Sequence, residues 1–348
     1  MMNFDYVRPA SVADAIAAAS EKGASYLASG TNLLDLMKGG VSRPSLLVDV
    51  TRLPGLDRIE HLADGGLRIG ALVRNADLAH DAEFARNYPA VAEALLSGAS
   101  AQLRNAATVG GNLMQRTRCA YFYDAGSACN RRWPGAGCDA LKGENRLHAV
   151  LGWSEGCIAT HPSDFCVPLV AFDAVVEIEG KTGRRELPLE ALHRLPGETP
   201  ERETALERGD LIVALRLPAE AQGFSGHARY IKVRERTSYA FAVVSAAAGL
   251  RIEDGKIREA RLALGGVAAK PWRAREAEQM LAGAAPDAAT YCEAARAALA
   301  GAKPSGDNAF KIELAQRIVV RALTLAAAGT PDRIPALPGS PFSSVAGA

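Results

Sequence analysis

The chain lacks any long apolar run. No part of its 348 residues approaches the roughly 20 consecutive apolar residues that a transmembrane helix needs. Residues 1–6 contain neither a basic segment nor an apolar segment of the kind that directs export, and no twin arginine. We therefore expect no membrane insertion and no signal peptide in this chain. It would be cytoplasmic, or periplasmic by co-export with a signal-bearing partner subunit.

An excess of charge of either sign is also absent. The 40 lysines and arginines nearly balance the 39 aspartates and glutamates, so the formal net charge is +1. No overall field therefore favours nucleic acid or an anionic membrane surface as a partner. A chain of 348 residues, 48% of them hydrophobic, is long enough for two or three compact units with their own cores.

Motifs for a nucleophile or a histidine-bound metal are missing too. The six histidines include no pair at i, i+4 spacing, and we find no Ser/His/Asp arrangement or paired carboxylates. Cysteine is scarce, with six residues in the chain. Four of the six nevertheless fall close together, at Cys119, Cys129, Cys138 and Cys157. This local enrichment favours a metal site over scattered disulfides.

The spacing of these four cysteines leaves several kinds of site open. The close cysteine pairs of structural zinc sites are absent, and so is the C-x4-C-x2-C spacing of plant-type [2Fe–2S] proteins. Long loops can still wrap an iron–sulfur cluster, while disulfides, zinc or free thiols remain alternatives. Basic residues that would stabilise thiolates surround the cysteines: Arg116, Arg118, Arg131, Arg132, Lys142 and Arg146. The other two, Cys166 and Cys292, have apolar neighbours and are expected to be buried small hydrophobes.

Two glycine-rich segments have a similar composition. Residues 28–33 and 108–113 each combine glycine, a hydroxyl side chain and an asparagine. Glycine lets backbone N–H groups converge on an anion such as a pyrophosphate. Neither segment is a G-x-G-x-x-G or a Walker loop, so a nicotinamide Rossmann site or a P-loop has little support. Two such loops on one side of a fold would indicate a dinucleotide.

The hydrophobic pattern predicts a mixture of helices and strands. A helix is expected over 11–23, capped by Ser11 and ended by Gly23. Residues 218–226 are expected to be a linker, and the Pro/Gly/Ser-rich tail from Pro331 to be loose. Further strands are expected at 25–28, 46–50, 67–71, 174–179 and 211–217, with antiparallel strands at 228–234, 241–252 and 258–267. Further helices are expected at 75–81, 89–99, 274–282, 287–300 and 309–328.

A family resemblance rests on segments that occur in a fixed order. They are residues 28–34, 103–113, 161–164 and 232–236. The chain resembles the FAD-binding medium subunits of the xanthine dehydrogenase family of molybdenum hydroxylases from about residue 3 to residue 328. One departure is Ser29, which stands where the family usually has glycine.

The resemblance implies a fold and its domains. We expect an α+β chain with a two-subdomain, PCMH-like FAD-binding fold over residues 1–221 and an insertion at about 115–160. A C-terminal α+β domain with an antiparallel sheet and helices would follow over 222–330, and a loose tail over 331–348.

The resemblance also implies which residues bind FAD. The two glycine-rich segments would bind the pyrophosphate of FAD from two sides. Asp164 would accept hydrogen bonds from the flavin, Lys232 would approach the isoalloxazine ring, and Ile212 would pack against it. His161 would support the turn that carries Asp164. The remaining predicted FAD-binding residues are Tyr26, Leu27, Ala28, Ser29, Gly30, Thr31, Asn32, Leu33, Leu34, Thr108, Gly111 and Asn112.

For the four cysteines, the resemblance favours one interpretation. Most family members lack this insertion, and a minority carry it with four cysteines that bind a [4Fe–4S] cluster. Residues 116–124 and 157–162 are very similar to the FAD subunits of periplasmic aldehyde oxidoreductases. The β subunit of 4-hydroxybenzoyl-CoA reductase also carries such a cluster and is an alternative. The implied ligands are Cys119, Cys129, Cys138 and Cys157.

The function implied is electron transfer within a larger oxidoreductase. The chain has no molybdopterin domain and no [2Fe–2S] motif, so it would be one subunit of a heterotrimer. A large molybdenum-cofactor subunit and a small [2Fe–2S] subunit would oxidise an aldehyde and deliver electrons. FAD and the [4Fe–4S] cluster would pass them to an external acceptor. The alternatives are a β subunit of a 4-hydroxybenzoyl-CoA reductase-like enzyme, a stand-alone flavin oxidase of the vanillyl-alcohol type, and a zinc-stapled binding module.

Overall fold

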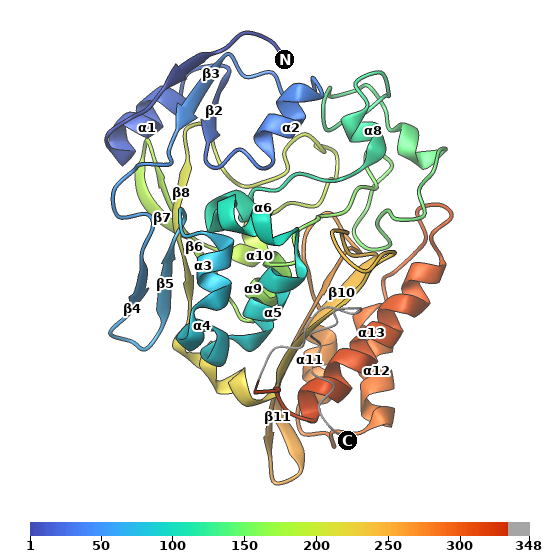
Figure 1. Ribbon diagram of the computed structural model, residues 1–348. Coiled ribbons are helices and arrows are strands. Elements are labelled where there is room, and N and C mark those ends of the chain that lie inside the picture. The colour runs from blue at the N-terminus through green and yellow to red at the C-terminus, as the bar shows by residue number, and fades with distance from the viewer. Residues whose placement is uncertain (333–348) are drawn as a thin grey trace.

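The structure is a computed structural model that describes residues 1–332 of the chain. The tail predicted to be loose lies, from residue 333 onward, outside the described residues. Figure 1 shows three parts: a small sheet near the N-terminus, a larger sheet with its helices, and a C-terminal sheet backed by helices. A long, mostly irregular segment, with α8 (Ala120–Tyr123), lies beside the first part.

The N-terminal part is a parallel sheet with the strand order β1-β3-β2. Its strands are β1 (Asp5–Val7), β2 (Ala24–Leu27) and β3 (Leu46–Asp49). Helix α1 (Val12–Ala19) begins where predicted, because the Ser11 side chain accepts a hydrogen bond from the Asp14 N–H. It ends at Ser20, earlier than predicted, and Gly23 forms the left-handed turn (φ +87°) into β2. Helix α2 (Leu33–Lys38) follows the first glycine-rich segment.

The second part is an antiparallel sheet with the order β4-β5-β8-β6-β7. Its strands are β4 (Ile59–His61), β5 (Leu67–Gly70), β6 (Val175–Gly180), β7 (Gly183–Pro188) and β8 (Leu211–Leu217). Its helices are α3 (Asn75–His80), α4 (Ala82–Asn87), α5 (Pro89–Ser97), α6 (Ala101–Ala106), α7 (Val109–Leu113), α9 (Cys166–Ala171) and α10 (Leu189–Leu192). One buried core joins this sheet to α3, α5, α7 and α9.

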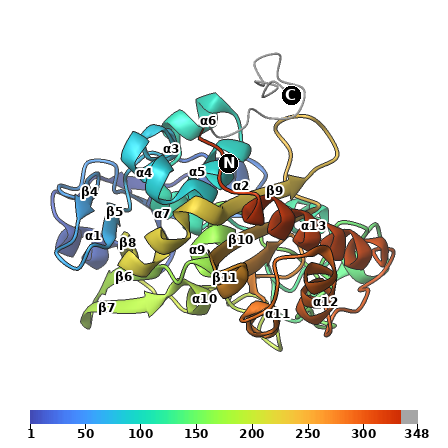
Figure 2. The same cartoon turned by 90° about the horizontal axis from the view of Figure 1, so that it is seen from below.

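The C-terminal part is an antiparallel sheet with the order β12-β11-β10-β9. Its elements are β9 (Ala228–Val233), β10 (Val244–Glu253), β11 (Lys256–Gly265), β12 (Trp272–Arg273), α11 (Arg275–Leu281), α12 (Ala288–Ala298) and α13 (Phe310–Ala327). The strands β10 and β11 alternate between two cores: Ala246 and Ala248 join the core with α11–α13, whereas Ala247 joins the core of the second part. Figure 2 shows this sheet between α9 and α13.

Close packing fixes the C-terminal sheet against α9. A Cβ atom added at Gly249 would lie 2.7 Å from Phe172 Cε1, and one added at Gly265 would lie 2.6 Å from Val167 Cγ2. Such distances leave no room for a larger side chain. The sheet therefore holds α9, and the turn just before it, in one position.

Residues 218–226, predicted to be a linker, connect the last strand of the second part to the first strand of the C-terminal part. These residues form the 3₁₀-helix η2 (Ala219–His227), so the predicted domain boundary at 221/222 falls inside a helix. Ala221 and Phe224 are three residues apart, which places them on one face of a 3₁₀-helix, and both are buried in the core of the second part. Polar and glycine residues around them hid this apolar pair in the sequence.

The segment from Gln115 to Thr160 has little regular structure besides α8 and η1 (Asp139–Leu141). Hydrogen bonds to backbone carbonyls, rather than regular secondary structure, fix the position of this segment. Arg132 donates to the carbonyls of Tyr121, Phe122 and Asp124 across its own loop. Lys311, which is fully buried on α13, donates to the carbonyls of Leu147 and His148. The C-terminal domain thus fixes the far end of the segment.

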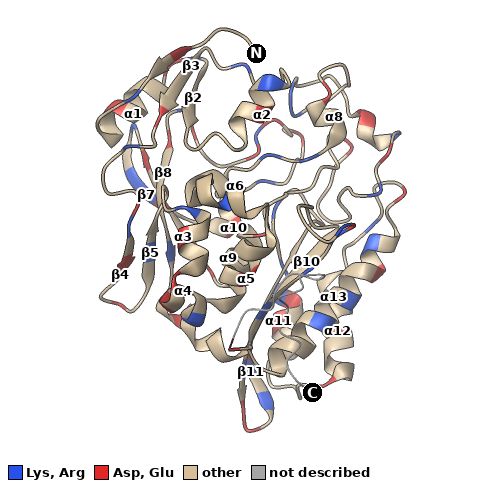
Figure 3. Ribbon diagram, viewed as in Figure 1, with Lys and Arg blue, Asp and Glu red and all other residues tan. Residues whose placement is uncertain are grey.

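Charged residues occur in each of the three parts of residues 1–332, with both signs interspersed (Figure 3). Among residues 1–332, no helix has both the length and the apolar character to cross a bilayer.

Candidate functional site

A cleft of about 770 Å³ lies where the three parts and the irregular segment meet. Its size is in the range of small-molecule and cofactor sites. Residues from α2, α5–α7, the irregular segment and the β9–β10 connection line it. Those used below are Thr31, Asn32, Asn75, Gly111, Asn112, Arg118, Cys119, Tyr121, His148, Asp164 and Phe241.

The second glycine-rich segment forms the start of α7. Thr108 caps this helix, accepting a hydrogen bond from the Gly111 N–H at 3.3 Å. Gly110 packs against Ala71, the residue after β5, since a Cβ atom there would lie 2.9 Å from the Ala71 Cβ. Gly111 instead faces the cleft with Asn112. The glycines therefore have two roles, one in close packing and one in leaving backbone open toward a ligand.

The first glycine-rich segment lies across the cleft, at the start of α2. Gly30 has φ +78°, and a Cβ atom there would lie 2.7 Å from Leu34 Cδ1, so only glycine fits without strain. Of the predicted residues 26–34, Thr31 and Asn32 line the cleft. Tyr26 and Leu27 belong to β2, and the Tyr26 hydroxyl donates to the Gly209 carbonyl instead. The structure thus brings the two glycine-rich segments to one cleft.

Unpaired polar atoms point to a missing polar ligand. Asn32 Oδ1 and Asn75 Oδ1 are buried without a hydrogen-bond partner, and both side chains line the cleft. Buried acceptors of this kind are rare in folded proteins unless a ligand or water pairs with them. A dinucleotide with hydroxyl and amide donors fits these residues.

Asp164 lies in the cleft and holds a buried ion pair. Lys232 Nζ donates to Asp164 Oδ2 at 2.8 Å and to the Ser97 carbonyl at 3.1 Å, while the Tyr230 hydroxyl donates to Oδ1 at 2.6 Å. Burial and the neighbouring carboxylate raise the pKa of Tyr230 well above its usual value, so its hydroxyl remains a donor. Lys232 does not line the cleft; it lies behind Asp164 and orients it.

Removing Lys232 is expected to destabilise the protein. The Lys232→Met variant leaves the Asp164 carboxylate buried without its counter-ion, and breaking a buried pair in this way costs roughly 3–5 kcal/mol. Urea unfolding followed by circular dichroism measures the loss. The matched control, Lys256→Met, removes an exposed lysine at the start of β11 and should change the free energy of unfolding little. A loss below about 1 kcal/mol in Lys232→Met, the size of a surface pair, would contradict the buried ion pair.

Ile212 lies outside the cleft. It is on β8, paired with Ile178 of β6, and is buried in the core of the second part. It is not among the residues that line the cleft. The structure places Ile212 in the sheet core, and its packing against the isoalloxazine ring stays a prediction.

Four cysteines, Cys119, Cys129, Cys138 and Cys157, converge beside this cleft and form what we call the cysteine set. Cys119 lines the cleft and precedes α8. Cys129 and Cys138 face each other in an antiparallel bridge, and all four thiols are free. Burial raises the pKa of Cys119 to about 11, with smaller contributions from the charges of Cys157 and Cys129, and burial followed by Cys157 raises that of Cys138. These thiols form thiolates only with a strong stabilising partner such as a metal.

Hydrogen-bond donors surround the cysteine sulfurs. Arg131 Nε lies 3.2 Å from Cys157 Sγ, and the Ala159 N–H is 3.5 Å from the same sulfur. His148 Nε2 lies 3.2 Å from Cys119 Sγ, and burial lowers the pKa of His148, so its imidazole is neutral. Such N–H···S contacts stabilise thiolate ligands of metals.

The separation of the sulfurs argues against a single zinc ion. Zinc–sulfur bonds of about 2.3 Å place the four sulfurs of a tetrahedral site roughly 3.8 Å apart. In residues 1–332, no three of these cysteines have sulfurs within 4.8 Å of one another. A four-iron cluster needs a wider arrangement, because iron and sulfide fill the centre between the thiolates. The four sulfurs are therefore spread more widely than a single tetrahedral zinc ion requires.

His161, Cys166 and His193 form a tighter group, with one ligand atom each within 4.8 Å of one another. The two imidazoles already have structural roles. His161 Nδ1 accepts from the Ser163 N–H, so its hydrogen is on Nε2, and His193 Nε2 donates to the Leu113 carbonyl. Burial lowers the pKa of His193 to about 4 and that of His161 well below its usual value, so both are neutral. His161 therefore supports the turn before Asp164, and with Nδ1 accepting and Nε2 protonated it has no free lone pair for a metal.

The other two cysteines differ in burial. Cys166 is fully buried, and burial raises the pKa of its thiol to about 12. Cys292 on α12 is only half-buried, so the expectation of full burial is wrong for it. An amphipathic helix places Tyr291 inward and turns Cys292 partly toward solvent.

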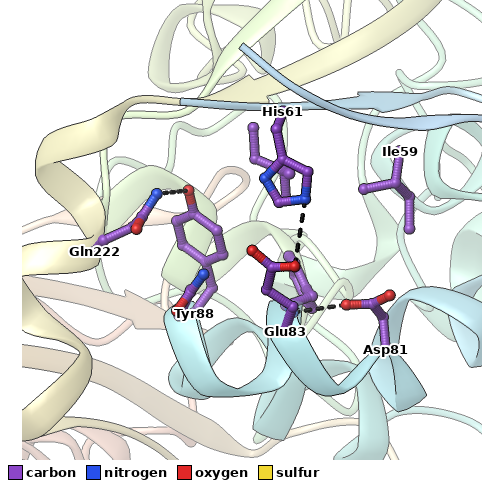
Figure 4. Close-up of a pocket in the computed structure, with 9 residues that line it drawn as sticks. Ile59, His61, Asp81, Glu83, Tyr88 and Gln222 are labelled. Carbon is purple, nitrogen blue, oxygen red and sulfur yellow. Dashed lines mark hydrogen bonds and ion pairs between the residues drawn. The ribbon is translucent and has the colours of Figure 1, made fainter. Parts of the chain in front are cut away.

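A second, smaller cavity of about 110 Å³ lies between β4, β5, α4 and η2 (Figure 4). Several of its polar groups are already paired: His61 contacts Glu83 at 3.6 Å, and Gln222 Nε2 donates to the Tyr88 hydroxyl at 3.2 Å. None of the predicted cofactor-binding residues lines it. It is too small for a dinucleotide.

Sequence reasoning missed several residues of the site. Asn75, His148 and Glu203 contribute to the cleft or to the cysteine set from distant parts of the chain. Arg131 was noted only as one of several nearby basic residues, without its specific contact. No local motif marks any of them, so only the three-dimensional contacts identify them.

Comparison with known proteins gives a consistent result. The family described as FAD binding domain in molybdopterin dehydrogenase matches residues 2–220, and the CO dehydrogenase flavoprotein C-terminal domain matches residues 229–326. Over 332 residues the chain is 50% identical to the aldehyde oxidoreductase FAD-binding subunit PaoB of Escherichia coli (strain K12), covering 94% of this chain and 99% of that protein.

Solved structures show the same fold. Carbon monoxide dehydrogenase from Hydrogenophaga pseudoflava is similar with a TM-score of 0.73 and 28% identity, covering 94% of this chain and 98% of that chain. Quinoline 2-oxidoreductase from Pseudomonas putida 86 is similar with a TM-score of 0.71 and 25% identity, with the same coverage of 94% and 98%. The predicted fold, an FAD-binding domain followed by an α+β domain with an antiparallel sheet, is confirmed.

Proposed function

The chain belongs to the FAD-binding medium subunits of the xanthine dehydrogenase family, and we propose that it is the FAD and [4Fe–4S] electron-transfer subunit of a molybdenum-containing aldehyde oxidoreductase. Family membership makes it a flavoprotein subunit of an oxidoreductase. The proposal adds the cluster, the aldehyde substrate and the external acceptor. Its partners would be a large molybdenum-cofactor subunit and a small [2Fe–2S] subunit.

One observation carries the proposal: Cys119 belongs both to the wall of the cleft and to the four-cysteine set. A cluster held by these cysteines would border the flavin cleft. Bound FAD would exchange electrons singly or in pairs, and a four-iron cluster one at a time. Two carriers in adjoining sites suit a subunit that passes electrons onward.

The chain's own residues would hold and orient these groups. The start of α2 and α7 would present backbone N–H groups to the FAD pyrophosphate. Asp164 keeps unused acceptor capacity beside its bonds from Lys232 and Tyr230, so it could also accept a hydrogen bond from the flavin. Similarity to PaoB, named as an aldehyde oxidoreductase subunit, supports an aldehyde as the substrate class.

Anaerobic reduction by aldehyde tests whether the substrate site lies in a partner subunit or in this chain. We expect aldehyde to bleach the flavin absorption of the chain when it is purified with its two partner subunits. The chain purified alone should keep its flavin oxidised in the same aldehyde, because the substrate site is in the partner. Aldehyde or alcohol oxidation by the lone chain would contradict the proposal and indicate a stand-alone flavin oxidase. Reduction of 4-hydroxybenzoyl-CoA by the complex, without aldehyde oxidation, would indicate the reductase alternative.

A further inference from the structure

Arg131 is a buried arginine beside the cysteine set. Its side chain is 5% exposed, and Nε lies 3.2 Å from Cys157 Sγ, within hydrogen-bonding distance of the sulfur. Nη1 donates to Glu203 at 2.7 Å. An arginine at this depth is rare unless it is paired. Its two partners here are one carboxylate and one cysteine sulfur.

Glu203 is shared with a second arginine. Arg116 also donates to the Glu203 carboxylate and lies over the Phe122 ring, 4.5 Å from its centre. Two guanidinium groups and one carboxylate leave an excess of one positive charge next to Cys157. A guanidinium group is not deprotonated in proteins, so Arg131 carries a full positive charge.

Charge distinguishes Arg131 from the other groups that contact these sulfurs. His148 Nε2 faces Cys119, and the Ala159 N–H faces Cys157 as a neutral amide, so neither is a guanidinium or an ammonium group. In residues 1–332, Arg131 is the one formally charged side chain hydrogen-bonded to a cysteine sulfur. A full charge in a buried position acts more strongly than one in water.

We propose that Arg131 is a positioning residue that raises the reduction potential of the cluster by its charge and its hydrogen bond to Cys157. This rests on the proposed function, since it requires the cluster. Reduction would add one electron, which the FAD of the same chain could supply, and no bond would form or break. The electron adds negative charge to a site that already has four thiolates, so a positive neighbour stabilises the reduced form more than the oxidised form.

Two substitutions are expected to shift the potential in opposite directions. Arg131→Gln removes the positive charge and should lower the midpoint potential. Glu203→Gln removes the negative charge that partly cancels Arg131 and should raise it. If the pair only stiffened the loop, both changes would loosen the same contact and would shift the potential in the same direction.

The experiment is a redox titration of the purified complex followed by electron paramagnetic resonance of the reduced cluster. We expect shifts of about 59 mV or more, which is a tenfold change in the equilibrium constant of a one-electron couple. The control is Arg202→Gln, since Arg202 is 53% exposed and pairs with Glu207 at the surface. Solvent screens that charge, so its removal should leave the potential unchanged.

Iron and flavin contents separate the outcomes. If both variants keep full iron and their midpoint potentials are unchanged, or shift in the same direction, Arg131 does not have this role, and the proposed function is unaffected.

If Arg131→Gln cannot hold iron, the potentials of Arg131→Lys and Glu203→Gln are measured instead, because lysine keeps the charge but cannot bridge both partners. The lysine variant should then lie close to the wild type and Glu203→Gln above it. A wild-type complex without iron contradicts the proposed function itself.

Discussion

Replacing Cys157 by serine is expected to remove the iron from this protein while leaving its FAD bound. A serine hydroxyl stays protonated at neutral pH and does not replace a thiolate on iron. Cys157 is 5% exposed and contacts Arg131, so its loss also leaves a buried guanidinium with one partner fewer. We expect iron to fall from about four atoms per chain to less than one. The same result is expected for Cys119, Cys129 and Cys138.

Iron analysis and the FAD released by denaturation measure this effect. The matched control is Cys292→Ser, because Cys292 is a half-buried cysteine on α12, outside the four-cysteine set. It should keep both iron and FAD. Full iron retention in each of the four variants would show that these cysteines are not the ligands.

Replacing Gly111 by valine is expected to abolish FAD binding. Gly111 lines the cleft in the first turn of α7, and a Cβ atom there would lie 3.1 Å from Thr108 Oγ1, the group that caps this turn. The rest of the valine side chain would occupy the space above the helix N-terminus, where the pyrophosphate is expected. Because Gly111 is exposed, the fold should tolerate the change. We expect a loss of at least about 100-fold in FAD affinity, or about 2.8 kcal/mol.

Fluorescence titration of the apoprotein with FAD gives this affinity. Gly301→Val is the control, since a Cβ atom at Gly301 meets nothing within 4 Å and the residue lies after α12, far along the chain from the cleft residues. It should bind FAD as the wild type does. Stoichiometric FAD in purified Gly111→Val would contradict the placement of the pyrophosphate at α7.

The regular elements could be predicted well from local patterns. Strands such as β8 and β10 and the helix α13 match their predicted ranges within a few residues, because their apolar periodicity is strong. The connection at 218–226 was recognisable, but its helical form, η2, was not. Its two buried residues are set among polar and glycine residues, and their burial depends on the core they meet in the folded chain.

The site could be predicted only in part. The motif around Asp164 and the two glycine-rich segments were recognisable, and the structure brings Thr31, Gly111 and Asp164 to one cleft. The residues that tune the site were not recognisable. Arg131 and Glu203 are 72 positions apart in the sequence, and no local pattern predicts their pairing.

One measurement tests the central claim, that FAD and an iron–sulfur cluster occupy adjoining sites of this one chain. It is the FAD, iron and sulfide content of the anaerobically purified chain, with its visible spectrum. We predict one FAD with about four irons and four sulfides per chain, and a flavin spectrum on a broad brown background. A yellow protein without iron, with Cys119, Cys129, Cys138 and Cys157 recovered as cystines or bound to zinc, would contradict the account.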